Sequence, residues 1–115
     1  MMNLYPVHNE PALMFGKTLI IADLHIGIEH VLRKAGFNIP SQSRKMMERI
    51  IVQCRKHTVN RVVIVGDIKH SISNASYQEF DEIPGFFEEL LNLGDVDVIP
   101  GNHDGGIKKL LPENV

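Results

Sequence analysis

The sequence is poor in the residues that cross-link a chain or carry it through a membrane. Cys54 is its only cysteine, and its 115 residues include no tryptophan. One cysteine excludes an intramolecular disulfide and a zinc site built on several cysteines, and it favours a reducing, cytoplasmic location. The longest apolar runs, such as 62–65, are far shorter than the roughly 20 residues that span a bilayer, and no signal pattern opens the sequence. We therefore expect neither a secreted protein nor a membrane protein.

The sequence also lacks an excess of charge of either sign. Twelve basic and 14 acidic residues give a net charge of -2, which supplies no global field for attracting nucleic acid. Any anionic substrate would need local positive charge. The hydrophobic fraction of 43% suffices for a core, and no change in composition divides the chain. We expect one domain over residues 1–115.

The apolar residues that are present form short runs separated by turn residues. Runs at 13–15 and 18–22 flank Gly16 and Lys17, which predicts a hairpin. The uninterrupted run 62–65 is typical of a parallel strand buried on both faces, and a further short strand is expected at 96–99.

Two segments between these runs have helical spacing. Apolar residues from Met46 to Cys54 predict a helix that begins near Ser41 as N-cap, and Cys54 continues its apolar stripe. A second stripe at 86–91 predicts another helix, with Pro84 in its first turn. The alternation of strands and helices predicts an α/β fold with a mostly parallel sheet and flanking helices.

Polar residues of one chemical kind follow three of the predicted strands. Asp23 and His25 follow the first, Gly66 and Asp67 follow the second, and 101–104 follow the third. The carboxyl ends of neighbouring parallel strands are where sites assemble, so these residues should meet. Residues two apart in an extended segment point to one side, so Asp23 and His25 could bind one metal together. Carboxylate, imidazole and amide oxygen together suit ions such as Mn, Fe or Zn.

Each of these motifs alone also has a plain structural explanation. Gly66 with Asp67 is a common turn, and Gly101 with Asn102 commonly supplies positive φ angles in a loop. Their order and shared position after apolar strands favour a site. A nucleotide-binding α/β domain is disfavoured, because no glycine-rich phosphate loop follows the first strand.

The three motifs together resemble the first three signatures of the calcineurin-like metallophosphoesterases. They are Asp23-x-His25, Gly66-Asp67-x-x-His70 and Gly101-Asn102-His103-Asp104. The segments 22–29 and 66–71 and the Gly-Asn-His-Asp-Gly run look most like the archaeal and bacterial branch associated with DNA ligase and helicase genes. The resemblance implies the first half of a four-layer αββα sandwich.

The resemblance also implies roles for individual residues. Asp23 and His25 would bind one divalent metal, Asp67 would bridge two metals, and Asn102 would bind the second. Two metals lower the pKa of a shared water and clamp phosphate oxygens during attack. His103 would then stabilise charge or protonate the leaving oxygen.

The sequence departs from the family pattern at two points. His70 stands where many relatives have an acidic residue, so it could contact phosphate, ligate a metal or cap a helix, while Asp104 could contact substrate or support a ligand. Two downstream signatures of the family, Gly-His and Gly-His-x-His, do not occur between Asp104 and Val115. We expect the metal site of these residues to be partial.

These observations predict a metal-dependent phosphoesterase whose substrate is a phosphate mono- or diester, possibly a nucleotide or nucleic acid. The alternative is a truncated, non-catalytic domain that serves as a metal-binding or interaction module. The family sandwich packs two sheets face to face, and the expected elements supply chiefly the first. We therefore also expect a homo-oligomer that covers the second face of the sheet.

Overall fold

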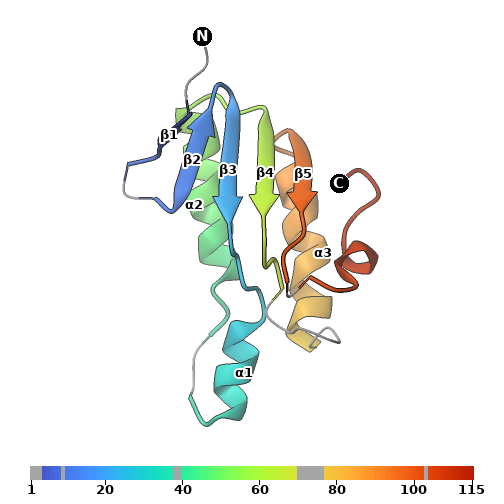
Figure 1. The fold of residues 1–115 in the computed structure, drawn as a ribbon. Helices are drawn as coiled ribbons and strands as arrows, with labels where there is room; N and C mark the ends of the chain where they lie inside the picture. The colour runs from blue at the N-terminus through green and yellow to red at the C-terminus, as the bar shows by residue number, and fades with distance from the viewer. Residues whose placement is uncertain (1–3, 9, 38–39, 70–76, 103) are drawn as a thin grey trace.

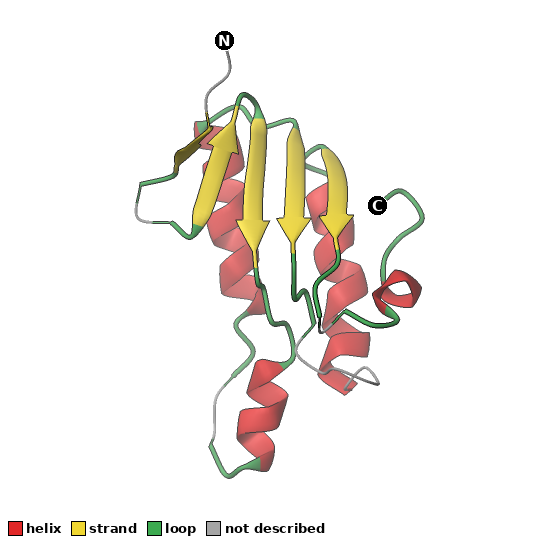
Figure 2. Ribbon diagram, viewed as in Figure 1, coloured by secondary structure: helices red, strands yellow, loops and turns green. Residues whose placement is uncertain are grey.

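The computed structural model describes residues 4–8, 10–37, 40–69, 77–102 and 104–115. Its five strands form one sheet in the order β1-β2-β3-β4-β5, and helices α2 and α3 lie on one face of it (Figures 1 and 2). The elements in chain order are β1 (Leu4–Pro6), β2 (Ala12–Phe15), β3 (Thr18–Ala22), α1 (Ile28–Lys34), α2 (Ser43–Lys56), β4 (Arg61–Val65), α3 (Tyr77–Leu91), β5 (Asp95–Ile99) and the short 3-10 helix η1 (Ile107–Leu110). The expected α/β architecture with flanking helices is confirmed.

The sheet is antiparallel at its N-terminal side and parallel where the polar motifs lie. Strands β1, β2 and β3 pair antiparallel, and Phe15 pairs with Thr18 across the predicted hairpin turn. Strands β3, β4 and β5 pair parallel, with Ala22 opposite Val65 and Val65 opposite Ile99. The three parallel strands therefore end at the same level of the sheet.

The core lies between this sheet and the two long helices. Leu19, Val62 and Ile64 on the sheet are at most 1% exposed, and Phe87 and Leu90 of α3 are fully buried. Val63 and Val65, which alternate with them, are only half-buried. The prediction that this strand is buried on both faces is wrong for the described residues, because α2 and α3 lie on the same side of the sheet (Figure 1).

Helix α2 begins one residue later than the sequence suggested. Gln42, not Ser41, occupies the N-cap position, and its side chain makes no capping bond. The Ser41 hydroxyl instead accepts the backbone N–H of Ser43 at 3.3 Å, so it still serves the first turn. Cys54 is 5% exposed, and burial raises the pKa of its thiol, as expected for a cysteine that packs as a small hydrophobe.

Helix α3 begins well before the proline that was expected in its first turn. Pro84 lies inside the helix, with seven helical residues ahead of it. Ile83 is fully buried, so the apolar face continues on the N-terminal side of the proline. Burial of this added surface offsets the backbone hydrogen bond that the proline ring removes.

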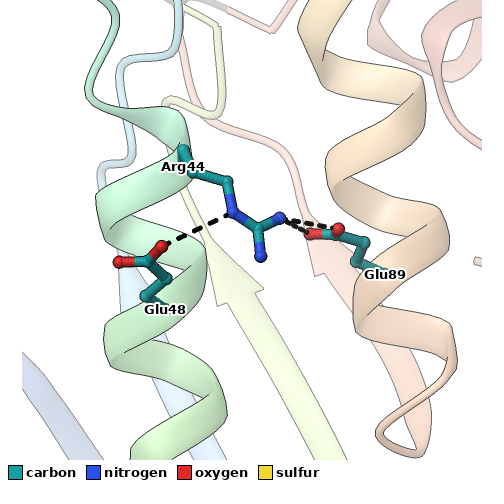
Figure 3. Close-up of polar contacts among 3 residues, drawn as sticks. All are labelled: Arg44, Glu48 and Glu89. Atoms are coloured by element: carbon teal, nitrogen blue, oxygen red, sulfur yellow. Dashed lines mark hydrogen bonds and ion pairs between the residues drawn. The ribbon is translucent and has the colours of Figure 1, made fainter.

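Arg44 links the two long helices on their outer side (Figure 3). Its guanidinium donates to both carboxylate oxygens of Glu89, at 2.7 and 3.0 Å, and lies 3.7 Å from Glu48. The hydrogen bond and charge of Glu89 raise the pKa of Arg44 further above its ordinary value. Because these groups are exposed, they contribute more to the relative orientation of the helices than to stability. Among the described helices, none has the length and apolar character needed to cross a membrane.

Candidate metal centre

The three polar motifs lie at the carboxyl ends of β3, β4 and β5. The pairing continues past the strands, since Asp23 N donates to Val65 O at 3.1 Å and Gly66 N donates to Ile99 O at 2.7 Å. One step further, His25 N donates to Asp67 O at 2.9 Å. The loop after β3 therefore runs directly along the loop after β4, which brings residues 42 positions apart into contact.

Asp23, His25 and Asp67 form one group of possible ligands. Each offers a ligand atom, and these atoms all lie within 4.8 Å of one another. Asp23 is exposed, while His25 and Asp67 are half-buried. The Nδ1 atom of His25 is itself buried. One imidazole and two carboxylates within this distance are a donor set that suits a divalent cation, which also relieves the repulsion between the carboxylates.

The backbone at these three residues adopts a positive φ angle, which residues other than glycine rarely do. The φ angles are 53° at Asp23, 47° at His25 and 22° at Asp67. Such conformations cost on the order of 1–3 kcal/mol each and persist where the surrounding structure holds them, often at functional sites. The continued pairing of the two loops holds these residues in place, so their side chains converge instead of alternating across the sheet.

Two glycines allow the loops to approach this closely. A Cβ atom at Gly66 would lie 3.0 Å from Asp23 Oδ1. A Cβ atom at Gly101 would lie 2.5 Å from the backbone nitrogen and 2.6 Å from Oδ1 of Asp67. Gly101 is therefore required by packing against Asp67, whereas Gly66 is favoured mainly by its positive φ of 68°. Asn102, which is exposed, directly follows the glycine that touches Asp67.

Asp104 connects the loop after β5 to the loop after β4. Its Oδ1 atom accepts the backbone N–H groups of Ile68 at 2.8 Å and Lys69 at 3.1 Å, and its Oδ2 atom accepts that of Gly101 at 2.7 Å. The residue is 4% exposed. Three hydrogen bonds from backbone amides to a buried carboxylate are strong and directional. Asp104 therefore ties the backbone that follows Asp67 to the loop that contains Gly101.

Two of the residues placed in the site from the sequence lie outside the described part of the chain. These are His70 and His103. The sequence reasoning also missed a buried lysine beside the site, since Lys69 is 1% exposed and sits two residues after Asp67. No signal in the sequence indicated that Lys69 is buried, because a lysine between an apolar residue and a histidine is normally expected to be exposed to solvent.

The family to which these motifs belong follows from a match over most of the chain. The profile of the calcineurin-like phosphoesterases matches residues 16–114, which include all three motifs. The chain belongs to the calcineurin-like phosphoesterase family. Its fold is also similar to the crystal structure of the nuclease MPE of Pseudomonas putida, with a TM-score of 0.60 and 17% sequence identity over 91% of this chain. The chain spans about half of that nuclease, 52% of its length.

The residues of this chain fit the divalent metals that the family implies. Asp23, His25 and Asp67 converge from two loops that meet edge to edge. Gly101 abuts Asp67 so closely that no side chain would fit between them. The geometry thus supplies a cation site of mixed oxygen and nitrogen ligands at the end of the parallel strands.

Proposed function

We propose that residues 1–115 are the metal-binding part of a phosphoesterase that hydrolyses phosphodiesters or nucleotides. The observation that carries this proposal is the convergence of Asp23, His25 and Asp67 within 4.8 Å at the ends of parallel strands. Activity and substrate are proposed for the whole protein, because the chain spans about half of the solved nuclease.

The proposed roles divide the ligands between two ions. Asp23 and His25 would hold the first, Asp67 would serve both, and Asn102 would help to hold the second through its amide oxygen. When bound, the ions supply positive charge that polarises the phosphate and lowers the pKa of a water molecule. The ions are of the Mn, Fe or Zn kind, which share this ligand preference. His103 is proposed to protonate the leaving oxygen.

Manganese binding tests the ligand assignment directly. We expect the Asp67→Asn variant to bind manganese at least about tenfold more weakly than the wild type in isothermal titration calorimetry, because it loses a charge next to both ions. Asp81→Asn is the matched control, since Asp81 is an exposed carboxylate on α3. Equal affinity of the wild type and Asp67→Asn would refute the bridging assignment.

Catalysis by residues 1–115 alone should be very weak, because the family's downstream histidines are not among them. We expect turnover of a generic phosphodiester with excess manganese to fall well below about 1 per second. Turnover above that rate, abolished by His103→Ala, would show that the partial ligand set suffices. No turnover together with tight manganese binding would favour the alternative of a metal-binding or interaction module.

The uncovered face of the sheet supports a proposal about assembly. Leu13, Phe15 and Ile99 are 37%, 41% and 56% exposed on that face. Large apolar side chains exposed together on one face of a sheet often mark an interface. We propose that this face is buried in a homo-oligomer.

We also propose a cytoplasmic location, because the single cysteine, Cys54, is buried and free and the chain needs no disulfide.

A further inference from the structure

A pocket lies between the hairpin of β2 and β3 and helix α2, which packs behind that hairpin in Figure 1. Its volume is about 130 Å³. Three of the residues that line it are aliphatic and at most 7% exposed: Leu19 and Ile21 on β3, and Ile50 on α2. Because protein cores are packed almost without voids, a space of this size against the core is a candidate for a ligand. We call it the hairpin pocket.

The charges on the lining of the hairpin pocket disfavour an anion. Arg49 Nη2 on α2 lies 2.6 Å from Glu10 Oε2, and Arg49 Nε donates to the same oxygen at 3.0 Å. Both residues line the pocket, so their ion pair links the two elements between which it opens. With Arg49 paired in this way, the other charged group on the lining is the carboxylate of Asp23. The pocket therefore favours a neutral occupant over a phosphate.

Gln53 of α2 gives the hairpin pocket a hydrogen-bond acceptor. The residue lines the pocket, and its Oε1 atom is buried with no hydrogen-bond partner among the described residues. A buried carbonyl oxygen without a donor is destabilising. A water molecule would need about two to four polar partners, whereas Leu19, Ile21 and Ile50 offer none. An apolar molecule with one N–H or O–H donor meets both requirements.

We propose that the hairpin pocket binds a small, neutral aromatic molecule with a single hydroxyl or amine donor, which donates to Gln53 Oε1. The size agrees with this class of ligand, because a dry aliphatic cavity of about 150 Å³ holds benzene. The buried aliphatic side chains contact the ring, and the Gln53 oxygen selects molecules that carry a donor. This site is additional to the proposed phosphoesterase function and does not depend on it.

The hairpin pocket and the ligand group share a wall. Asp23 belongs to both, and Leu24, which separates Asp23 from His25 in the sequence, lines the pocket and is 8% exposed. An occupant therefore packs against the segment that carries two of the proposed metal ligands. Binding of the occupant and binding of a metal should change each other's affinity by the same factor.

Phenol is the probe, and its titration into isotope-labelled protein in EDTA, followed by NMR, tests the pocket without a metal. We expect saturable shifts at the lining residues with a dissociation constant of about 1 mM. Gln53→Met should weaken phenol binding about fivefold, because methionine keeps the length of the side chain and removes the acceptor. Binding of toluene, which has no donor, should not weaken. Gln42→Met is the matched control, since Gln42 is the N-cap of α2 and does not line the pocket.

Filling the hairpin pocket is an independent test. Ala12 on β2 lines it, on the same face of the strand as the fully buried Met14. Ala12→Leu should abolish binding of both phenol and toluene, because the added side chain occupies the space. Ala35→Leu is the control for added bulk, since Ala35 is exposed directly after α1. If circular dichroism shows that Ala12→Leu does not fold, the comparison of Gln53→Met with Gln42→Met decides.

The proposal is overturned if phenol causes no saturable shifts, if the two glutamine variants lose affinity equally, or if the shifts lie on the open face of the sheet. The outcome is separate from that of the metal proposal. Asp67→Asn should bind phenol in EDTA as well as the wild type does, because Asp67 does not line the pocket. Manganese should change the dissociation constant of phenol at least about twofold. An unchanged value at high manganese concentration would refute the coupling and leave the site standing.

Discussion

The two faces of the sheet consist of the same strands but have different surroundings. Toward α2 and α3, the side chains of Met14, Val62 and Ile64 are fully buried, whereas Phe15 and Ile99 on the other face are 41% and 56% exposed. The cause is topological. The connections from β3 to β4 and from β4 to β5 both place their long helices on the same side (Figure 2). The sequence of an apolar strand therefore does not reveal whether other segments of the same chain cover one of its faces or both.

The open face is not apolar throughout. Arg61 forms ion pairs with Asp97 and Asp95 across β4 and β5 on this face, at the end of the sheet opposite the ligand group. Leu13 and Phe15 belong to β2, on the side of the sheet away from β5. A covering partner would thus bury the apolar side and leave the charged corner at its rim, where ion pairs cost little.

Replacing one phenylalanine on each face should give the largest expected difference in the free energy of unfolding. Phe87→Ala should lower the free energy of unfolding by about 3–5 kcal/mol, because it leaves a cavity in the core between α3 and the sheet. Phe15→Ala should cost less than about 1 kcal/mol in dilute protein. Urea denaturation at a low, fixed protein concentration measures both. Comparable losses would show that the open face is covered within this chain.

Assembly provides the next test. Size-exclusion chromatography with light scattering should give a dimer or larger species, and Phe15→Asp should raise its dissociation constant at least about tenfold, because a charge would be buried in the interface. Val52→Asp is the control, since Val52 is 57% exposed on the outer side of α2. A monomer at all concentrations that unfolds cooperatively would contradict the proposed homo-oligomer.

The smallest expected effects come from the ion pairs on the two sides of the molecule. Arg44→Ala and Arg61→Ala should each lower stability only slightly, and high salt should remove most of the difference. If the open face is an interface, the cost of Arg61→Ala should grow with protein concentration, while that of Arg44→Ala should not. Denaturation curves at two protein concentrations decide this. A large loss of stability in Arg44→Ala that does not depend on salt would contradict the conclusion that its exposed ion pairs add little stability.

Local signals in the sequence predicted the elements that contain strong apolar patterns. The hairpin at Gly16 and Lys17, the strand β4 and both long helices follow from spacing that reflects the geometry of a strand or a helix. Short elements were missed. Strand β1, helix α1 and η1 contain three, seven and four residues, too few for a period to show. The start of α3 was misplaced because Pro84 resembles a helix start, although buried Ile83 lies ahead of it.

The sequence by itself determined which residues are candidates for binding a metal and that they follow strands. Asp23, His25 and Asp67 could be named because motif spacing is a local property of the chain. Only the tertiary structure decided that their ligand atoms lie within 4.8 Å of one another and that Asp104 ties two loops together through backbone amides. It also decided that the described residues leave one face of the sheet uncovered. These features depend on strand register and on the side of each crossover, which arise from contacts between residues far apart in the sequence.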